Sequence, residues 1–182
     1  MDIIKSVTVP VAVDEAFRLF TEQPGQWLPP AHTFIRDPVL IAMEPWAGGR
    51  FYERGADGTE ITRGTILDWA PPARLVVTWR VGASWRPVFD DEQASRIRAE
   101  FRPASAGSGA AGSGAAGSGA AGSGAAGSGA ADPGGAGVTE VVLTYAELDR
   151  HGPFAAQLRA ALEAGDPGES LQNYADLAAR RG

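Results

Sequence analysis

The sequence contains no cysteine, and this absence excludes several kinds of site at once. A disulfide framework, thiolate metal ligands and a cysteine nucleophile are all ruled out. Histidine is scarce too, because only His32 and His151 occur, and neither has a second histidine or an acidic cluster at metal-ligand spacing. No Gly-x-Ser-x-Gly elbow is present either. We therefore predict no metal site, no cofactor and no familiar hydrolytic triad.

Positive charge and long apolar runs are also in short supply. Lysine and arginine total 16 against 22 aspartate and glutamate residues, so the net charge of −6 predicts no nucleic-acid partner and no anionic membrane partner. No stretch approaches the roughly 20 apolar residues of a membrane span, and the first ten residues lack the layout of a signal peptide. These features predict a cytoplasmic location. They leave the assembly state open, with a homodimer as one alternative.

Glycine, serine and alanine dominate one long segment, where residues 106–130 are five perfect copies of Ala-Gly-Ser-Gly-Ala. Each of the first four copies, read into the first glycine of the next copy, has the glycine pattern of a dinucleotide-binding turn, but the strand, helix and acidic residue that give that pattern its chemistry are missing. We predict that residues 104–137 form a disordered insert in the last strand-to-strand connection of a single domain spanning 1–182. Closing a loop of this length costs only about 1.7 kcal/mol more in chain entropy than closing a short turn. Replacing it with a short turn is therefore expected to leave ligand binding intact.

The remaining sequence predicts strands followed by helices. A helix is expected to begin at Val13 with Asp14 as its N-cap and to end before Pro24. The C-terminal part is helical, with a break at Gly165 and a second helix running to about Arg180. Short links between the strands favour an antiparallel meander. The predicted strands cover residues 3–9, 35–44, 49–54, 59–69, 74–81, 95–102 and 138–148.

Four stretches narrow this pattern further. They are Val9-Pro10 with the helix start at 13–17, Gly48-Gly49-Arg50-Phe51, the segment 64–80 with its Pro71-Pro72-Ala73-Arg74-Leu75 turn, and residues 139–145. Together they resemble the START-like (SRPBCC, helix-grip) superfamily, and within it the subfamily named after activators of a heat-shock chaperone ATPase. The resemblance covers essentially everything outside the insert.

The resemblance implies an α+β fold. A seven-stranded curved antiparallel sheet would grip a long C-terminal helix, two short helices would follow the first strand, and a cavity would lie between sheet and helix. Relatives by fold bind lipids, hormones and polyketides, and a few catalyse cyclisation or dehydration. Eukaryotic chaperone activators carry an additional chaperone-binding domain, and no segment of this sequence corresponds to it. The family label therefore says little about activity.

Alternation along the predicted strands assigns side chains to the two faces of the sheet. It places Trp79, Ile97 and Tyr145 toward the cavity. If Phe51 points inward then so does Glu53, and if Ile61 points inward then so does Arg63. Opposite charges in an apolar cavity must pair with each other or with a ligand. The alternative is that one bulge turns either charged side chain to solvent.

Tryptophan is abundant, and aromatic walls suit planar or acyl ligands, although buried aromatic residues also form ordinary core. Tyr145 is either a donor to a ligand carbonyl or a satisfied core tyrosine. His151 has either a turn or capping role or a role in acid-base chemistry. The predicted ligand-binding residues are Trp27, Trp46, Phe51, Glu53, Arg63, Trp79, Ile97, Tyr145 and Tyr174.

Three functions fit these observations. The first is a binder of a small hydrophobic or aromatic molecule in the internal cavity between sheet and C-terminal helix, with no enzymatic activity or only weak activity. The second is a cyclase or dehydratase that uses cavity groups such as Glu53, Arg63, Tyr145 or His151 for proton transfer. The third is a co-chaperone-like or regulatory protein that binds a partner.

Overall fold

The computed structural model describes residues 1–82, 85–88, 90–104, 137–165 and 168–182. These form one seven-stranded antiparallel sheet in the order β1-β7-β6-β5-β4-β3-β2. The strands are β1 (Ile3–Val9), β2 (Leu40–Met43), β3 (Arg50–Arg54), β4 (Glu60–Ala70), β5 (Arg74–Trp79), β6 (Ser95–Pro103) and β7 (Thr139–Ala146). The α-helices are α1 (Val13–Glu22), α2 (Pro24–Trp27), α3 (Ala155–Ala164) and α4 (Gly168–Ala179), and the short 3-10 helices are η1 (Pro30–His32), η3 (Asp91–Gln93) and η4 (Leu148–Phe154). The predicted α+β helix-grip fold is confirmed.

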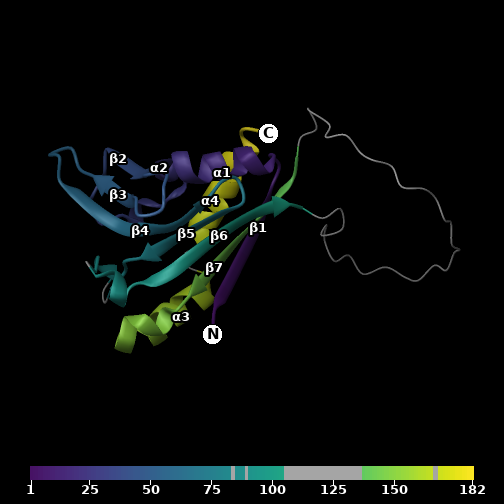
Figure 1. Cartoon of the computed structure of the whole chain (residues 1–182). Helices are drawn as coiled ribbons and strands as arrows, with labels where there is room; N and C mark the ends of the chain where they lie inside the picture. The colour runs from purple at the N-terminus through teal and green to yellow at the C-terminus, as the bar shows by residue number, and fades with distance from the viewer. Residues whose placement is uncertain (83–84, 89, 105–136, 166–167) are drawn as a thin grey trace, which may run out of the picture.

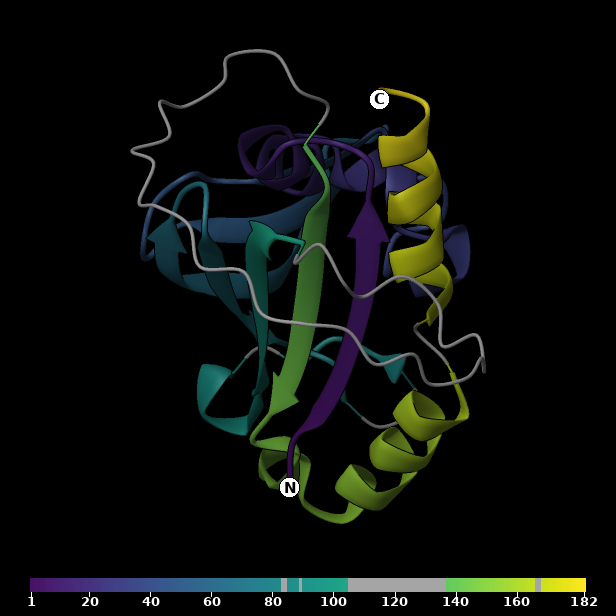
Figure 2. The ribbon, with the colours of Figure 1, turned by 90° about the vertical axis from the view of Figure 1, so that its right-hand side faces the viewer.

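The sheet curls around the helices rather than lying flat. Figure 1 shows α1 across one end of the sheet, α3 at the other end and α4 behind the strands. Figure 2 shows α3 and α4 one above the other beside β1, so the C-terminal helical segment runs along the sheet in two pieces. The division falls where it was predicted, because Gly165 ends α3 with a left-handed φ of 112°.

Two local predictions were wrong. Residues 35–39 are not part of a strand, and β2 begins only at Leu40. The reason lies in Asp37, whose φ is 52°, and in Pro38, which has no N–H to donate to a ladder. Helix α1 begins at Val13 as expected, but its N-cap is Ala12 and no side chain caps it. Asp14 lies inside the first turn instead, where its charge still favours the helix dipole.

The strands flanking the predicted insert pair with each other. Strands β6 and β7 are adjacent and antiparallel up to the pair Pro103 and Thr139, and the Ala104 N–H donates to the Val138 carbonyl at 2.8 Å. The prediction of a disordered insert over 104–137 rests on residues 105–136, which lie outside the described residues.

Aromatic side chains close one end of the curled sheet. Phe17 and Phe20 on α1 both pack edge-on against Phe101 of β6, with ring centroids 5.2 and 5.5 Å apart. Phe20 also contacts Tyr174 of α4, and the Tyr174 hydroxyl donates to the Ala16 carbonyl at 2.8 Å. Because α1, β6 and α4 meet through these contacts, this packed end of the domain is held together by an aromatic core.

A polar cluster on the outer face ties η3 to the two central strands. Both Asp91 oxygens accept from the Arg80 guanidinium, at 2.7 and 2.9 Å. They also accept from the hydroxyls of Thr78 and Thr65, each at 2.8 Å. These hydrogen bonds lower the pKa of Asp91 to about 2, with the Arg80 contact contributing most. The carboxylate therefore anchors the segment that follows β5.

This network predicts an acid-sensitive contribution to stability. Because the folded-state pKa of Asp91 lies below its ordinary 3.8, the stabilisation is fully present above 3.8 and is lost as pH falls toward about 2. The Asp91→Asn variant is expected to be less stable than the wild type at neutral pH, and the difference is expected to shrink below pH 3.8. Urea unfolding at several pH values measures this. For Glu163→Gln, on the exposed side of α3, the difference should stay small at every pH.

Candidate functional site

A buried ion pair lies on the inner face of the sheet, between β3 and β4. The Arg63 guanidinium donates from Nη1 to Glu53 Oε1 at 3.1 Å, and the exposed fractions of the two side chains are 7% and 0%. Both side chains therefore face inward, the alternative that strand alternation gave for the case in which Phe51 and Ile61 point inward. A bulge does occur in this strand pair, because Phe51 pairs with Gly64 while Tyr52 pairs with Thr62, which leaves Arg63 as the extra residue. The Arg63 side chain still reaches Glu53, whose ladder partner is Ile61.

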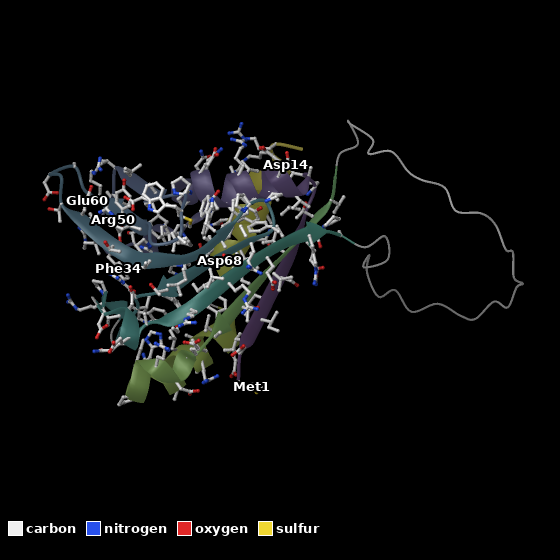
Figure 3. The ribbon with its side chains drawn as sticks, in the orientation of Figure 1. Met1, Asp14, Phe34, Arg50, Glu60 and Asp68 are labelled. Carbon is white, nitrogen blue, oxygen red and sulfur yellow. The ribbon has the colours of Figure 1, made fainter. Side chains whose placement is uncertain are left out.

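The ion pair also holds the connection that precedes β2. Glu53 Oε1 accepts from the Phe34 backbone N–H at 2.7 Å, and Arg63 Nη2 donates to the His32 carbonyl at 2.8 Å. The guanidinium lies 4.9 Å from the Phe34 ring and 5.2 Å from the Phe51 ring, which is cation–π distance. Figure 3 labels Phe34 at this edge, beside the arm formed by β3 and β4. The two charged groups thus pair with each other and also hydrogen-bond to the loop that contains His32 and Phe34.

The same inner face carries an aromatic row on the neighbouring strands. The Arg63 carbonyl accepts a hydrogen bond from the Arg80 backbone N–H. This contact places Arg63 next to Trp79, the last residue of β5. Trp79 contacts Tyr145 of β7 with ring centroids 5.3 Å apart, and Ile97 of β6 lies opposite Tyr145. The structure therefore brings together six of the residues predicted from the sequence. They are Phe51, Glu53, Arg63, Trp79, Ile97 and Tyr145.

The end of the inner face that carries Trp79 differs from the packed end in the solvent exposure of its side chains. Phe51, Trp79 and Ile97 are only partly buried, although none of their strands is an edge strand and all three side chains pack against the core. Inward residues farther along the same strands, such as Leu75 and Ala99, are almost completely buried at 1% each. A set of large apolar side chains that keeps access to solvent inside a curved sheet is typical of a binding surface.

His151 lies at the border of this surface. Its Nε2 accepts from the Ser95 backbone N–H at 3.3 Å and lies 2.8 Å from the Ser95 hydroxyl, and its ring meets Trp79 edge-on. Because Nε2 accepts, the proton of the neutral ring lies on Nδ1. Burial lowers the pKa of His151, and a hydrogen bond with the Val81 backbone opposes that effect. These contacts join η4 to the ends of β5 and β6.

Three predicted ligand-binding residues lie elsewhere. Trp27 stacks on Phe20 and donates from Nε1 to the Phe20 carbonyl at 3.1 Å, so it belongs to the packed end. Tyr174 is completely buried there. Trp46 lies in the turn between β2 and β3 and is 53% exposed. Contact between any of the nine residues and a ligand stays a prediction.

A pocket of about 640 Å³ lies between α1 and the sheet. None of its lining residues belongs to α3 or α4, so it differs in position from the predicted cavity under the C-terminal helices. On α3, Leu158 and Leu162 are completely buried. The pocket is lined by Asp14, Phe17, Arg18, Thr21, Glu22, Met43, Pro45, Trp69, Pro71 and Pro72.

Sequence reasoning missed three residues at the inner surface. Phe34 lies just before residues 35–39, which had been predicted as the start of a strand, and no sequence pattern places it over Arg63. His32 contacts Ser170 of α4 at 3.1 Å, a contact between segments far apart in sequence. Ser95 was within reach of prediction, because it pairs with Trp79 in the ladder and alternation puts both on the inner face.

Two features are absent from the part of the chain that the structure describes. Within it, no three His, Asp or Glu side chains gather closely enough to hold a metal ion. No helix in the same residues has the length and apolar character that crossing a bilayer requires.

The curled seven-stranded sheet and its C-terminal helices define a START-like, SRPBCC-type fold. The model of the family described as "Activator of Hsp90 ATPase homolog 1-like protein" matches residues 10–110. This match covers more than half of the 182 residues, and the chain belongs to that family. A comparison with curated protein sequences found no match.

Solved structures give the same architecture. The chain is 36% identical to an anthrahydroquino-γ-pyrone synthase, Txn09, over 96% of this chain and 95% of that one, with a TM-score of 0.56. It is 24% identical to CalC, a self-sacrificing resistance protein from Micromonospora echinospora, with coverage of 100% and 96% and a TM-score of 0.60. A protein from Nitrosomonas europaea is 16% identical, with coverage of 100% and 96% and a TM-score of 0.55. The last two likenesses show the fold alone.

Proposed function

We propose that this protein binds a small, planar, hydrophobic or aromatic molecule on the inner face of the sheet, between the sheet and the C-terminal helices. One observation carries the proposal: large inward side chains on central strands, with Trp79 in the middle, stay partly exposed beside a buried ion pair. Aromatic walls with a few convergent polar groups are the usual lining of small-molecule sites. Binding with no catalysis, or with only weak catalysis, requires the fewest functional side chains beyond these.

A titration with anthraquinone tests this proposal. Thermal stability should rise on ligand addition, because a ligand that binds only the folded state stabilises it. Trp79→Leu is expected to weaken binding about tenfold or more, since it removes an aromatic wall. The matched control is Trp46→Leu, which alters an exposed tryptophan outside the inner face. The proposal is wrong if acyl, steroid and aromatic ligands all fail to shift the unfolding temperature, or if the two variants bind equally well.

A second candidate is a ring-closing enzyme, and the likeness to Txn09 favours it. That protein is a synthase by name, and the 36% identity extends over nearly the whole chain. In such a closure here, a ligand hydroxyl would lose its proton as its oxygen bonds to a conjugated carbon, and the proton would end on the neighbouring carbon. Glu53 is the carboxylate on the inner face that could carry this proton, with no oxidant or reductant required. Turnover that depends on Glu53 would support this candidate over simple binding.

The chaperone-partner alternative rests on the family's name alone. Nothing in the described residues singles out a surface for a chaperone, and a family name does not transfer an activity. A stable complex with a chaperone at low micromolar concentration would favour it over the two ligand-based functions.

A further inference from the structure

The ion pair of Glu53 and Arg63 leaves one polar atom of each partner unused. Glu53 places both of its contacts on Oε1, which accepts from Phe34 N–H and from Arg63 Nη1. Within the described residues, Glu53 Oε2 and Arg63 Nε have no hydrogen-bond partner, and both atoms are buried. Buried polar atoms are nearly always paired, and leaving a charged group unsatisfied is unfavourable. The site therefore lacks one donor and one acceptor.

The two unused atoms have complementary roles. A carboxylate oxygen accepts hydrogen bonds, whereas the Nε–H of a guanidinium donates one. The 3.1 Å contact joins Glu53 Oε1 to Arg63 Nη1. Glu53 Oε2 shares a carbon with Oε1, and Arg63 Nε shares a carbon with Nη1, so the two unused atoms lie close to this contact. A single ligand fragment that carries a donor beside an acceptor can satisfy both. A hydroxyl next to a carbonyl on a planar ring is the simplest fragment of this kind.

The surroundings of Arg63 fit a flat ligand. Phe34 and Phe51 both lie against its guanidinium at cation–π distance, and both rings are partly exposed. Phe34 belongs to a segment outside any strand or helix, and the backbone N–H of Phe34 and the carbonyl of His32 attach this segment to the ion pair. An aromatic ligand that takes the place of the Phe34 ring would keep an aromatic layer over Arg63 while reaching the two unused atoms.

We propose that Glu53 and Arg63 recognise a hydroxyl beside a carbonyl on an aromatic ligand, with Glu53 Oε2 accepting from the hydroxyl and Arg63 Nε donating to the carbonyl oxygen. This inference rests on the proposed function and names the class of ligand for that same site. It makes the ion pair a determinant of specificity as well as a support for the loop.

Three ligands of nearly equal size test the inference on the unaltered protein. In 1-hydroxyanthraquinone the hydroxyl is next to a carbonyl, in 2-hydroxyanthraquinone it is remote from both carbonyls, and anthraquinone has none. Hydrogen bonds to charged groups predict that the first binds at least about tenfold more tightly than the other two, even after its internal hydrogen bond is exchanged for protein contacts. Isothermal titration or quenching of tryptophan fluorescence measures the three dissociation constants.

The outcomes separate this inference from the proposed function. Equal affinity for all three ligands would overturn the inference and leave the proposed function standing. This result is expected if a water molecule, and not the ligand, pairs with Glu53 Oε2 and Arg63 Nε. If none of the three binds, the inference is wrong, and the proposed function is wrong too when acyl and steroid ligands also fail to shift the unfolding temperature. Glu53→Gln replaces a carboxylate oxygen with an amide and is expected to narrow the ratio between the two hydroxy isomers. Glu60→Gln, which alters an outer-face carboxylate paired with Arg50, should leave that ratio unchanged. If Glu53→Gln does not fold, the ligand series on the wild type still decides.

Discussion

Arg63→Met is expected to lower the free energy of unfolding by about 3–5 kcal/mol, because it leaves the Glu53 carboxylate buried without a counter-charge. The Glu53 side chain has no exposed surface, so bulk solvent does not compensate for the loss of the guanidinium. Burial by itself already disfavours the charged form of Arg63, whose pKa it lowers, with the charge of Glu53 and its hydrogen bond acting in the opposite direction. Urea unfolding at neutral pH without ligand measures the loss.

A double variant distinguishes an unpaired charge from a general packing defect. Glu53→Leu combined with Arg63→Met removes both charges and keeps similar volume, and it should recover most of the stability that the single variant loses. Recovery should be incomplete, because the Phe34 N–H and the His32 carbonyl also lose their partners.

A surface pair provides the control for this comparison. Arg102 pairs with Glu140 at 2.9 Å but is 63% exposed, so Arg102→Met should change stability by no more than about 1 kcal/mol. If Arg63→Met costs no more than Arg102→Met, the ion pair does not hold the loop to the sheet as described.

Strand alternation predicted the sheet well because its inner face is deeply buried. Where one face of a strand packs on a core, a one-residue slip would expose the whole apolar set, so the pattern determines the register. Leu143 and Tyr145 on β7 were placed inward on that basis, and both are buried. The pattern fails where burial stops, at residues 35–39, because the alternation there has no core to match and Asp37 turns the chain.

The site itself was only partly predictable. Alternation placed Glu53 and Arg63 on the inner face on the condition that Phe51 and Ile61, each two residues away in the same strand, point inward. Their third partner could not be found in this way, since Phe34 reaches them from a loop whose path depends on tertiary contacts. The pocket beside α1 was equally out of reach, because Phe17 and Trp69 come together there from elements distant in the sequence. Periodicity predicts faces, whereas cavities depend on how whole elements pack.

Gly64→Ala is expected to destabilise the protein severely, by about 3 kcal/mol or more, or to prevent soluble expression. A Cβ atom at position 64 would lie 2.0 Å from the Thr78 carbonyl oxygen and 2.9 Å from Val77 Cγ2. The carbonyl belongs to the backbone of β5, so no rotamer change can move it away. Strands β4 and β5 are interior strands of the sheet, and separating them would disturb the pairing on both sides.

The expected loss at Gly64 arises from close approach of two backbones and not from an unusual dihedral angle, so a glycine with open space is the proper comparison. At Gly25 in α2 the nearest atom to an added Cβ is Ile41 Cβ at 3.9 Å, an ordinary contact. Gly25→Ala should therefore be neutral or stabilise by about 0.4–1 kcal/mol, because alanine has fewer unfolded conformations and a higher helix propensity. Thermal and urea unfolding of both variants measure the contrast.

A Gly64→Ala protein within about 1 kcal/mol of the wild type would show that β5 can shift away from β4 at little cost. Because Arg63 precedes Gly64 directly and Trp79 follows Thr78, such a shift would also separate the ion pair from the aromatic row, and ligand affinity should then fall although stability is kept.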